Sequence, residues 1–396
     1  MSKDKLIPEL RFPEFEEFGE WDRKTLEFVA DSESSNLALN KIEHKKNGYP
    51  VYGADSIVGH IDQYQQEEKY ISIVKDGSGV GRLNLCIPKS SILGTLACIK
   101  SKDLEKFNLD WIYYLMNTID FTSYKKGSGI PHIYFSDFKI EPIGVPKPQE
   151  QQKIASCLSS LDELLAAHND KLDALKDHKK GLLQNLFPQE GESVPKVRFS
   201  EFEGDGEWVE KELSEVSTII TGSTPSTKVP EYYGGDIMFV SPADISNNKY
   251  VESTEKTLSL EGFEKTRKIK ANSVMFVCIG STIGKVAMNK FECATNQQIN
   301  SLVPNNENSS DFLYSNLELN AFKISGIAGN QAVPIINKTL FSSVKLKFPP
   351  TKEEQQKIAS CLSAVDELIT AQQEKIEQLQ QHKKGLMQGL FPKIES

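Results

Sequence analysis

Several features that mark other protein classes are missing from this sequence of 396 residues. No apolar run approaches the ~20 residues that a membrane-spanning helix requires, and the start lacks the apolar core of a signal peptide. The six cysteines include no C-x-x-C pair, and the six histidines show no metal-ligand spacing. We therefore expect a cytoplasmic protein with reduced, buried thiols, no metal site and no membrane contact.

The chain also lacks the basic excess of many DNA-binding proteins, because 46 Lys and Arg face 55 Asp and Glu. The charge is unevenly spread: residues 22–145 carry 15 basic and 16 acidic side chains, and residues 209–345 carry 13 and 14. Near-neutral segments can still present a basic face. A DNA-binding role would then need a partner that helps to neutralise phosphates.

Motifs of catalysis are incomplete. Residues 77–81 suggest a dinucleotide loop, but a strand-like run follows them instead of a helix. Residues 280–285 are one residue short of a P-loop, and Val286 replaces its Ser or Thr. We predict a tight hairpin turn at both places. Asp55 with residues 67–69 fits a nuclease pattern only loosely, and the second half of the chain has no match.

What the chain does contain is an internal repeat. Residues 150–158 recur letter for letter at 354–362, an offset of 204. An entry motif, Arg-Phe followed by Phe and Gly-Glu-Trp, occupies residues 11–21 and recurs at 198–208, an offset of 187. The second copy is thus 17 residues longer (204 − 187). A duplicated chain mimics a two-fold dimer, so we expect a function with two parts.

An apolar stripe with alternating steps of four and three residues runs through the end of each copy. Such a heptad pattern predicts two long helices, each led by prolines and opening with glutamate, that pair antiparallel as a coiled coil. The predicted pairing and docking residues are Ile154, Leu158, Leu161, Leu165, His168, Leu172, Leu175, Ile358, Leu362, Val365, Ile369, Gln372, Ile376 and Leu379. His168 and Gln372 are polar rungs that would fix the register. The alternative is two separate amphipathic helices.

The middle of each copy looks β-rich, with strands expected at 70–74 and 274–279 and helices at 107–117 and 311–320. The predicted fold class is α+β: two homologous β-rich domains separated by two long antiparallel coiled-coil helices, with pseudo-two-fold symmetry. The predicted segments are a first domain with its entry motif (1–145), a first helix (146–190), a second domain (191–345) and a second helix (346–396).

Polar loops in both middles carry residue types that read DNA bases. Asn and Gln can pair bidentately with adenine, and Lys or Arg with guanine. The candidate DNA-binding residues are Arg82, Tyr124, Lys125, Lys126, His132, Lys285, Asn296, Gln297, Asn330 and Gln331. For each of them, ordinary turn chemistry is the alternative.

Taken together, the duplicated entry motif, the proline-led E-Q-Q-K-I-A helices, the strand-turn G-S-x-x-G and the stretch 296–298 resemble the specificity subunit of type I restriction–modification enzymes. The resemblance covers nearly the full length. It implies that the two middles are target recognition domains, each similar to that of adenine-specific DNA methyltransferases and each reading one half of a split double-stranded site.

The resemblance also implies partners. Two methyltransferase subunits would dock on the paired helices and carry S-adenosylmethionine, while motor-nuclease subunits would use ATP and Mg²⁺. The chain itself would bind no cofactor and would not be an enzyme. The competing hypotheses are a methyltransferase or nuclease complete in one chain, and a coiled-coil scaffold that binds no DNA.

Overall fold

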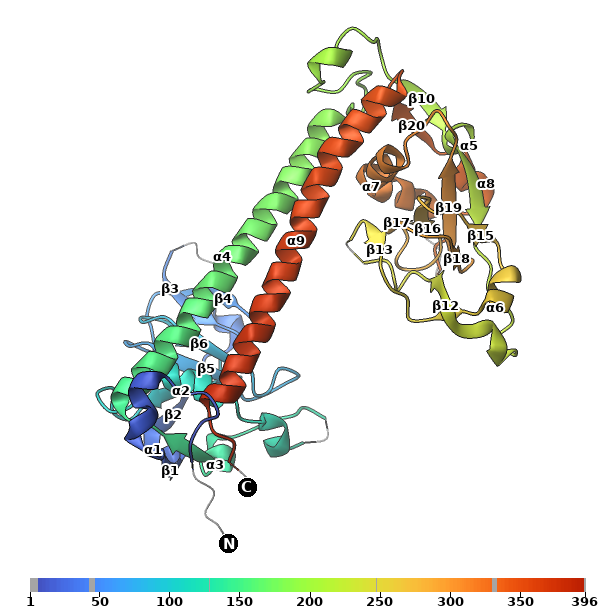
Figure 1. The fold of residues 1–396 in the computed structure, drawn as a ribbon. Coiled ribbons are helices and arrows are strands. Elements are labelled where there is room, and N and C mark those ends of the chain that lie inside the picture. The colour runs from blue at the N-terminus through green and yellow to red at the C-terminus, as the bar shows by residue number, and fades with distance from the viewer. Residues whose placement is uncertain (1–5, 43–46, 128, 247, 330–332, 395–396) are drawn as a thin grey trace. The chain divides into compact units, whose positions relative to one another are not determined.

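The structure is a computed structural model that describes residues 6–42, 47–127, 129–246, 248–329 and 333–394. It divides into two compact units: unit 1 contains Met1–His168 and Ile376–Ser396, and unit 2 contains Asn169–Lys375. Each unit holds one β-rich domain, part of one long helix and part of the other (Figure 1). The four segment boundaries expected from the sequence stay a prediction, since each unit combines pieces of both helical segments.

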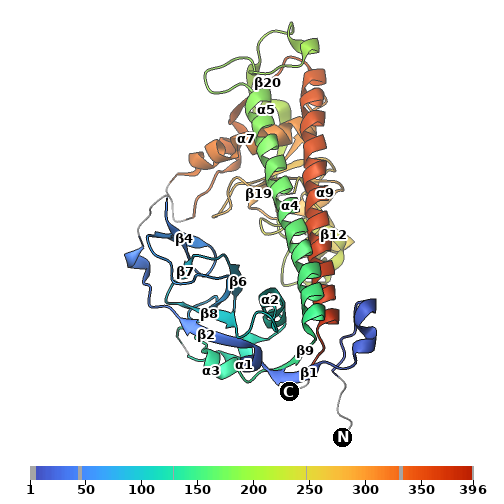
Figure 2. The same cartoon turned by 90° about the vertical axis from the view of Figure 1, so that its left-hand side faces the viewer.

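The two long helices are α4 (Pro148–Leu186) and α9 (Lys352–Leu390), each of 39 residues. At 1.5 Å per residue each is about 58 Å long. In unit 1, Lys383 of α9 pairs with Asp162 of α4; in unit 2, Lys179 of α4 lies 2.8 Å from Asp366 of α9. In each unit the first part of one helix therefore runs antiparallel beside the last part of the other (Figure 2). All fourteen residues of the predicted stripe are buried or half-buried.

The domain of unit 1 contains a four-stranded antiparallel sheet in the order β2-β8-β5-β6 and a three-stranded sheet in the order β4-β3-β7. Their strands are β2 (Ala30–Ser34), β3 (Tyr49–Tyr52), β4 (Ile57–Ile61), β5 (Tyr70–Val74), β6 (Leu83–Cys86), β7 (Ser91–Ile92) and β8 (Leu96–Ser101). The helices are α1 (Leu26–Val29), α2 (Leu109–Met116) and α3 (Phe135–Phe138), with 3₁₀ turns at Pro13–Phe18, Leu39–Lys41 and Phe121–Tyr124.

The domain of unit 2 contains a five-stranded sheet in the order β11-β19-β16-β17-β13 and a four-stranded sheet in the order β14-β12-β18-β15. Their strands are β11 (Ser217–Thr221), β12 (Tyr233–Val240), β13 (Tyr250–Val251), β14 (Thr257–Leu258), β15 (Lys268–Ile269), β16 (Val274–Val277), β17 (Val286–Asn289), β18 (Cys293–Thr295) and β19 (Ile299–Pro304). The helices are α5 (Leu213–Val216), α6 (Leu260–Glu264), α7 (Ser310–Ser325) and α8 (Lys338–Ser342), with 3₁₀ turns at Ser200–Phe202, Pro230–Tyr232 and Gly326–Ala328.

Each domain is closed by a short strand pair at its base. In unit 1, β1 (Asp22–Thr25) pairs antiparallel with β9 (Pro142–Val145), so that Asp22 faces Val145. In unit 2, β10 (Val209–Glu212) pairs in the same way with β20 (Lys345–Phe348). The chain therefore enters and leaves each domain at one place.

The predicted hairpin turns are confirmed. Strands β5 and β6 pair antiparallel around residues 77–81, and β16 and β17 do so around residues 280–284. Gly81 has φ +90°, and a Cβ there would lie 2.7 Å from the Cβ of Phe121, so both the backbone and the space require glycine.

The core of each unit includes the end of the helix that belongs to the other repeat. In unit 1, Trp21 packs edge-to-face on Phe391, with ring centroids 6.4 Å apart. In unit 2, Trp208 packs on Phe187 at 5.7 Å. Burial of these aromatic pairs ties each entry motif to a helix end from the other copy.

All six cysteines are free thiols. Burial raises the pKa of Cys98, Cys278 and Cys293 to about 12, so these thiols stay protonated and unreactive at neutral pH. In the described part of the chain, every helix is too short or too polar to cross a membrane.

Candidate functional site

The entry motif and the first turn of the long helix form a buried cluster of hydrogen bonds in each copy, which we call the clamp. In unit 1 the Arg11 guanidinium donates to both carboxylate oxygens of Glu150, at 2.8 Å each, and to the Gly19 carbonyl at 2.5 Å. The Trp21 indole donates to the same carboxylate at 3.1 Å. The Glu150 side chain is 1% exposed. A buried carboxylate needs this full set of donors, which explains why Arg, Gly, Glu and Trp occur together.

Unit 2 builds the same clamp from the second copy. Arg198 donates to Glu354 at 2.8 and 2.7 Å and to Gly206 at 2.7 Å, and Trp208 donates to Glu354 at 3.2 Å. The Glu354 side chain is fully buried. The entry motif is therefore a structural anchor in both copies.

The glutamine after each clamp glutamate anchors the domain. The side-chain oxygen of Gln151 accepts a hydrogen bond from the backbone amide of Asn108, just before α2, at 2.9 Å. The side-chain oxygen of Gln355 accepts from the backbone amide of Ser309, just before α7, also at 2.9 Å. Each glutamine thus caps a helix whose first amides have no partner inside the helix. The E-Q-Q motif fixes a domain to its long helix.

An exposed patch on the first half of each long helix is also identical in the two copies. We call it the outer patch: Gln152, Lys153, Ser156, Glu163 and Leu164 on α4, and Gln356, Lys357, Ser360, Glu367 and Leu368 on α9. Leu164 is 42% exposed and Leu368 is 56% exposed. Packing inside the chain does not require leucine at either exposed place.

The stripe is buried or half-buried. Subunit docking on the stripe residues stays a prediction, and the outer patch was not singled out from the sequence. The signal was present in the sequence, since residues 152, 153, 156, 163 and 164 recur unchanged at an offset of 204.

The last part of each long helix carries a lysine that binds carboxylates between helix and domain. In unit 2, Lys179 lies 2.6 Å from Glu318 and 2.8 Å from Asp366. Burial raises the pKa of Glu318, with Lys179 opposing and Asp366 assisting. Burial would lower the pKa of Lys179, but the two carboxylates raise it, so the lysine stays charged.

In unit 1 the corresponding lysine, Lys383, makes this contact with different partners. Lys383 pairs with Asp162, and the Tyr114 hydroxyl donates to the other oxygen of Asp162 at 2.7 Å. In unit 2 the position that corresponds to Tyr114 is Ser315 (offset 201). The Ser315 hydroxyl donates to the backbone carbonyl of Asp311 instead. Unit 2 therefore brings one more carboxylate, that of the half-buried Glu318, to this lysine than unit 1 does.

The structure brings the predicted DNA-binding residues of unit 1 together. The Gly77 amide donates to the Pro131 carbonyl at 2.9 Å, and Lys126 and His132 exchange two backbone hydrogen bonds of 2.9 Å. The hairpin turn that bears Arg82 and the segment 124–132 thus lie side by side.

Most of the predicted DNA-binding side chains of unit 1 already have partners within the domain. Arg82 is half-exposed and pairs with Asp55, while Lys126 lies 2.6 Å from Asp137. The Tyr124 hydroxyl donates to Glu141, which raises the pKa of Tyr124 to about 12. Lys125 is exposed.

In unit 2 the predicted DNA-binding side chains form hydrogen bonds with other groups of the same domain. The Lys285 ammonium donates to the carbonyls of Pro242 and Ile245, at 3.3 and 2.7 Å. The Asn296 side chain donates to the side-chain oxygen of Gln298 and accepts from the Gln298 backbone amide. The side-chain oxygen of Gln297 accepts from the Thr224 hydroxyl at 2.7 Å. Asn330 and Gln331 lie outside the described residues. Base contact by any of these ten residues stays a prediction.

Within the described residues, no group of three or more His, Cys, Asp or Glu side chains is arranged to hold a metal ion.

The comparison with protein families is decisive. The family model described as "Type I restriction modification DNA specificity domain" matches residues 19–177 and again residues 205–381. This chain belongs to the type I DNA-specificity family. Both copies of the repeat are matched, so the resemblance seen in the sequence is confirmed.

Relatives of this chain are described as specificity subunits of type I restriction enzymes. The "Putative type I restriction enzyme MjaX specificity subunit" of Methanocaldococcus jannaschii is 23% identical over 402 residues, covering 94% of this chain and 93% of the relative. The MjaIX specificity subunit of the same organism is 29% identical over 48% of this chain, and the HindI specificity subunit of Haemophilus influenzae is 34% identical over 37%. These last two matches span 45% and 32% of the relatives' own lengths.

A solved structure shows the same fold. The specificity subunit of a type I restriction–modification system from M. genitalium matches with a TM-score of 0.70 at 17% identity, over 98% of this chain and 100% of that one. The predicted fold class is confirmed. The family also supports a non-catalytic DNA-specificity subunit over a self-contained methyltransferase, a nuclease or a scaffold that binds no DNA.

Proposed function

We propose that this specificity subunit recognises a split double-stranded DNA target, with each domain reading one half-site. The observation that carries the proposal is the division of the repeat. The clamp and the outer patch have the same residues in both copies, and the helix stripe has the same spacing, whereas the polar loops of the two domains differ. A constant frame with two unlike domains suits a protein that presents two unlike half-sites to identical partners.

The partners in this proposal are two methyltransferase subunits, one on each outer patch, joined by motor-nuclease subunits in the cytoplasm. The methyltransferase subunits would bind S-adenosylmethionine and methylate adenine, and the motor-nuclease subunits would use ATP and Mg²⁺. Partners would also supply phosphate contacts, since the chain itself has a net charge of −9.

The deciding experiment is to assemble the chain with its methyltransferase subunits and to map the methylated adenines in DNA of random sequence. We expect two short specific half-sites at a fixed spacing. Methylation of one contiguous site would overturn the proposal. The matched control is the purified chain alone, incubated with DNA and S-adenosylmethionine or with DNA and Mg²⁺. Methylation or cleavage by the chain alone would favour a self-contained enzyme instead.

A further inference from the structure

The domain of unit 2 carries a basic segment that lies outside the repeated motifs. Residues 265–270 read Lys-Thr-Arg-Lys-Ile-Lys, with four basic side chains and no acidic one. The segment includes β15, which is an edge strand of the sheet β14-β12-β18-β15. Ile269 is fully buried, whereas all four basic residues are exposed. The strand is therefore held in the core by its apolar side chain and presents its cations to solvent.

Most of these cations have no acidic partner in the domain. Lys268 pairs with Glu264 of α6. Within the part of the chain that the structure describes, no carboxylate forms an ion pair with Lys265, Arg267 or Lys270. Lysine and arginine side chains neutralise the phosphates of DNA, and each such contact releases a counter-ion. The segment therefore has the free positive charge that phosphate contact requires.

Arg267 is held in a defined position within this segment. It is the one arginine between residues 209 and 345. Its backbone amide donates to the Ser223 hydroxyl at 2.9 Å, and its Nη1 donates to the Thr221 carbonyl at 2.9 Å. The second bond orients the guanidinium and leaves the rest of its planar donor fork to a ligand.

The loop that positions Arg267 also contacts the predicted base-reading stretch. The Ser223 amide donates to the Thr295 carbonyl at 2.9 Å. The Thr224 hydroxyl donates to the side-chain oxygen of Gln297 at 2.7 Å, and Gln297 itself is exposed. Arg267 and Gln297 are thus joined through one short loop and lie on the same part of the domain.

The corresponding place in unit 1 has the opposite charge. Strands β7 and β18 are equivalent, since each pairs in parallel with β3 or β12. Gln66 is bridged to Ser90 just before β7, as β15 is paired with β18. The eight residues before β5 include three acidic and one basic, whereas the eight before β16 include three basic and no acidic. The two domains therefore differ here, as readers of unlike half-sites would.

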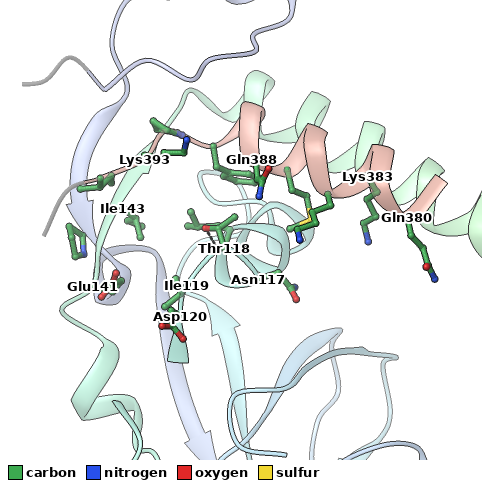
Figure 3. A pocket seen from close by; sticks show the side chains of 18 residues that line it. Asn117, Thr118, Ile119, Asp120, Glu141, Ile143, Gln380, Lys383, Gln388 and Lys393 are labelled. Atoms are coloured by element: carbon green, nitrogen blue, oxygen red, sulfur yellow. Dashed lines mark hydrogen bonds between the residues drawn. The ribbon is translucent and has the colours of Figure 1, made fainter. Parts of the chain in front are cut away.

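The lysines of the long helices are repeated instead. Lys383 and Lys384 line a groove of about 620 Å³ in unit 1, between the end of α9, the turn that follows α2, and β9 (Figure 3). The same positions of α4 hold Lys179 and Lys180 (offset 204). A lysine that both copies repeat belongs to the common frame, so it does not distinguish one half-site from the other.

We propose that Arg267 reads a guanine of the second half-site in the major groove of the DNA, while Lys265 and Lys270 contact the flanking phosphates. The inference rests on the proposed function, which assigns one half-site to each domain. The planar fork of arginine matches the O6 and N7 acceptors of guanine, and no other base presents this pair of acceptors. Arg267 is therefore a specificity-determining residue, and the two lysines supply affinity.

Removal of the guanidinium should relax one position of the DNA motif. The chain is assembled with its methyltransferase subunits and incubated with DNA in which the second half-site is randomised, and the methylated molecules are sequenced. The wild-type complex should require guanine within that half-site. Arg267→Ala should lose this requirement at one position and bind the wild-type site roughly 10- to 100-fold more weakly. Arg267→Gln, which keeps a polar side chain, should lose the guanine preference at the same position.

The lysines should behave differently from Arg267. Lys265→Ala and Lys270→Ala should each weaken binding to all sequences alike, and reduce the steepness of log affinity against log salt by about one. Lys345→Ala is the matched control, because this exposed lysine lies on β20 at the base of the domain and not on β15 (Figure 1). It should change neither the motif nor the salt dependence. An unchanged melting temperature confirms that each variant is folded.

The outcomes separate the two proposals. An unchanged motif in a folded Arg267→Ala complex, or a second half-site without guanine, overturns base reading by Arg267 and leaves the proposed function standing. Relaxed specificity in the first half-site would equally contradict the assignment to unit 2. A wild-type complex that methylates no two-part site overturns the proposed function itself.

Discussion

Arg11 and Glu150 are joined by two parallel hydrogen bonds, from Nε to Oε1 and from Nη2 to Oε2, each 2.8 Å long. The two residues lie 139 positions apart in the chain, and Arg198 and Glu354 repeat the arrangement. Paired bonds of this kind fix orientation as well as distance. They determine how the chain enters each domain beside the start of a long helix.

Removing one partner of the clamp should leave a buried charge. Arg198→Ala is expected to lower the free energy of unfolding by roughly 3–5 kcal/mol, because the fully buried Glu354 loses its counter-ion. Urea titration followed by circular dichroism measures the change. The control is Lys357→Ala, which removes an exposed pair with Glu201 of 3.0 Å and should have little effect. Equal changes in the two variants would contradict a clamp role.

The extra carboxylate of unit 2 should make stability depend on pH. Burial raises the pKa of Glu318 above its ordinary value of 4.5, so the folded chain holds this proton more tightly than the unfolded chain does. Relative to Glu318→Gln, the wild-type free energy of unfolding should therefore fall as pH rises above about 4.5 through the raised pKa.

Urea titrations of both proteins between about pH 4 and pH 8 test this, with the exposed Glu374→Gln as the control. The control should follow the wild type at every pH. A Glu318→Gln protein with the wild-type pH profile would show that Glu318 titrates normally.

Exchange of one domain should change one half-site. Residues 22–145 begin and end at the paired residues Asp22 and Val145, so a domain from another family member can join the frame at a single place. We expect a new first half-site, an unchanged second half-site and an unchanged spacing, read by mapping methylated adenines in the assembled complex. The matched exchange runs from Val209 to Phe348, the corresponding pair of unit 2. A change in both half-sites would show that the domains do not read independently.

The length of the long helices should set the spacing between half-sites. One heptad inserted in α4 and one at the corresponding place in α9 lengthens each helix by about 10 Å. At about 3.4 Å per base pair this corresponds to a spacer longer by about three base pairs. The same mapping measures the spacer, and insertion of seven residues in the linker between α4 and β10 is the control. An unchanged spacer after the helical insertion would refute the role of the helices as a ruler.

Periodicity made the long helices and the β5–β6 hairpin predictable, because apolar spacing depends on local geometry alone. The clamp was not predicted, although its letters were seen to repeat. Arg11 and Glu150 meet only through tertiary structure, and spacing along the chain does not show which repeated polar residues touch. The extent of α7 was also underestimated: the helix continues to Ser325, and Glu318 in its second half pairs with Lys179, a contact that only the fold creates.

The partners of Lys285 and Asn296 show a second reason for incomplete prediction. Their residue types suit DNA bases, but each donates to its own domain, to the Ile245 carbonyl and to Gln298 respectively. Composition identifies what a side chain can bind, and the fold decides which partner it meets first.

The packing of Phe391 on Trp21 has a consequence for synthesis of the protein. As the chain leaves the ribosome, the first domain emerges early, yet its core includes Leu390 and Phe391, which are translated after the whole second domain. The first domain must wait, incomplete and with Trp21 uncovered, while the core of unit 2 can close on residues 169–375 alone. Domains usually fold in order of synthesis. Here the domain made first is the one that finishes last, and that interval is when the nascent chain is most exposed to proteases and chaperones.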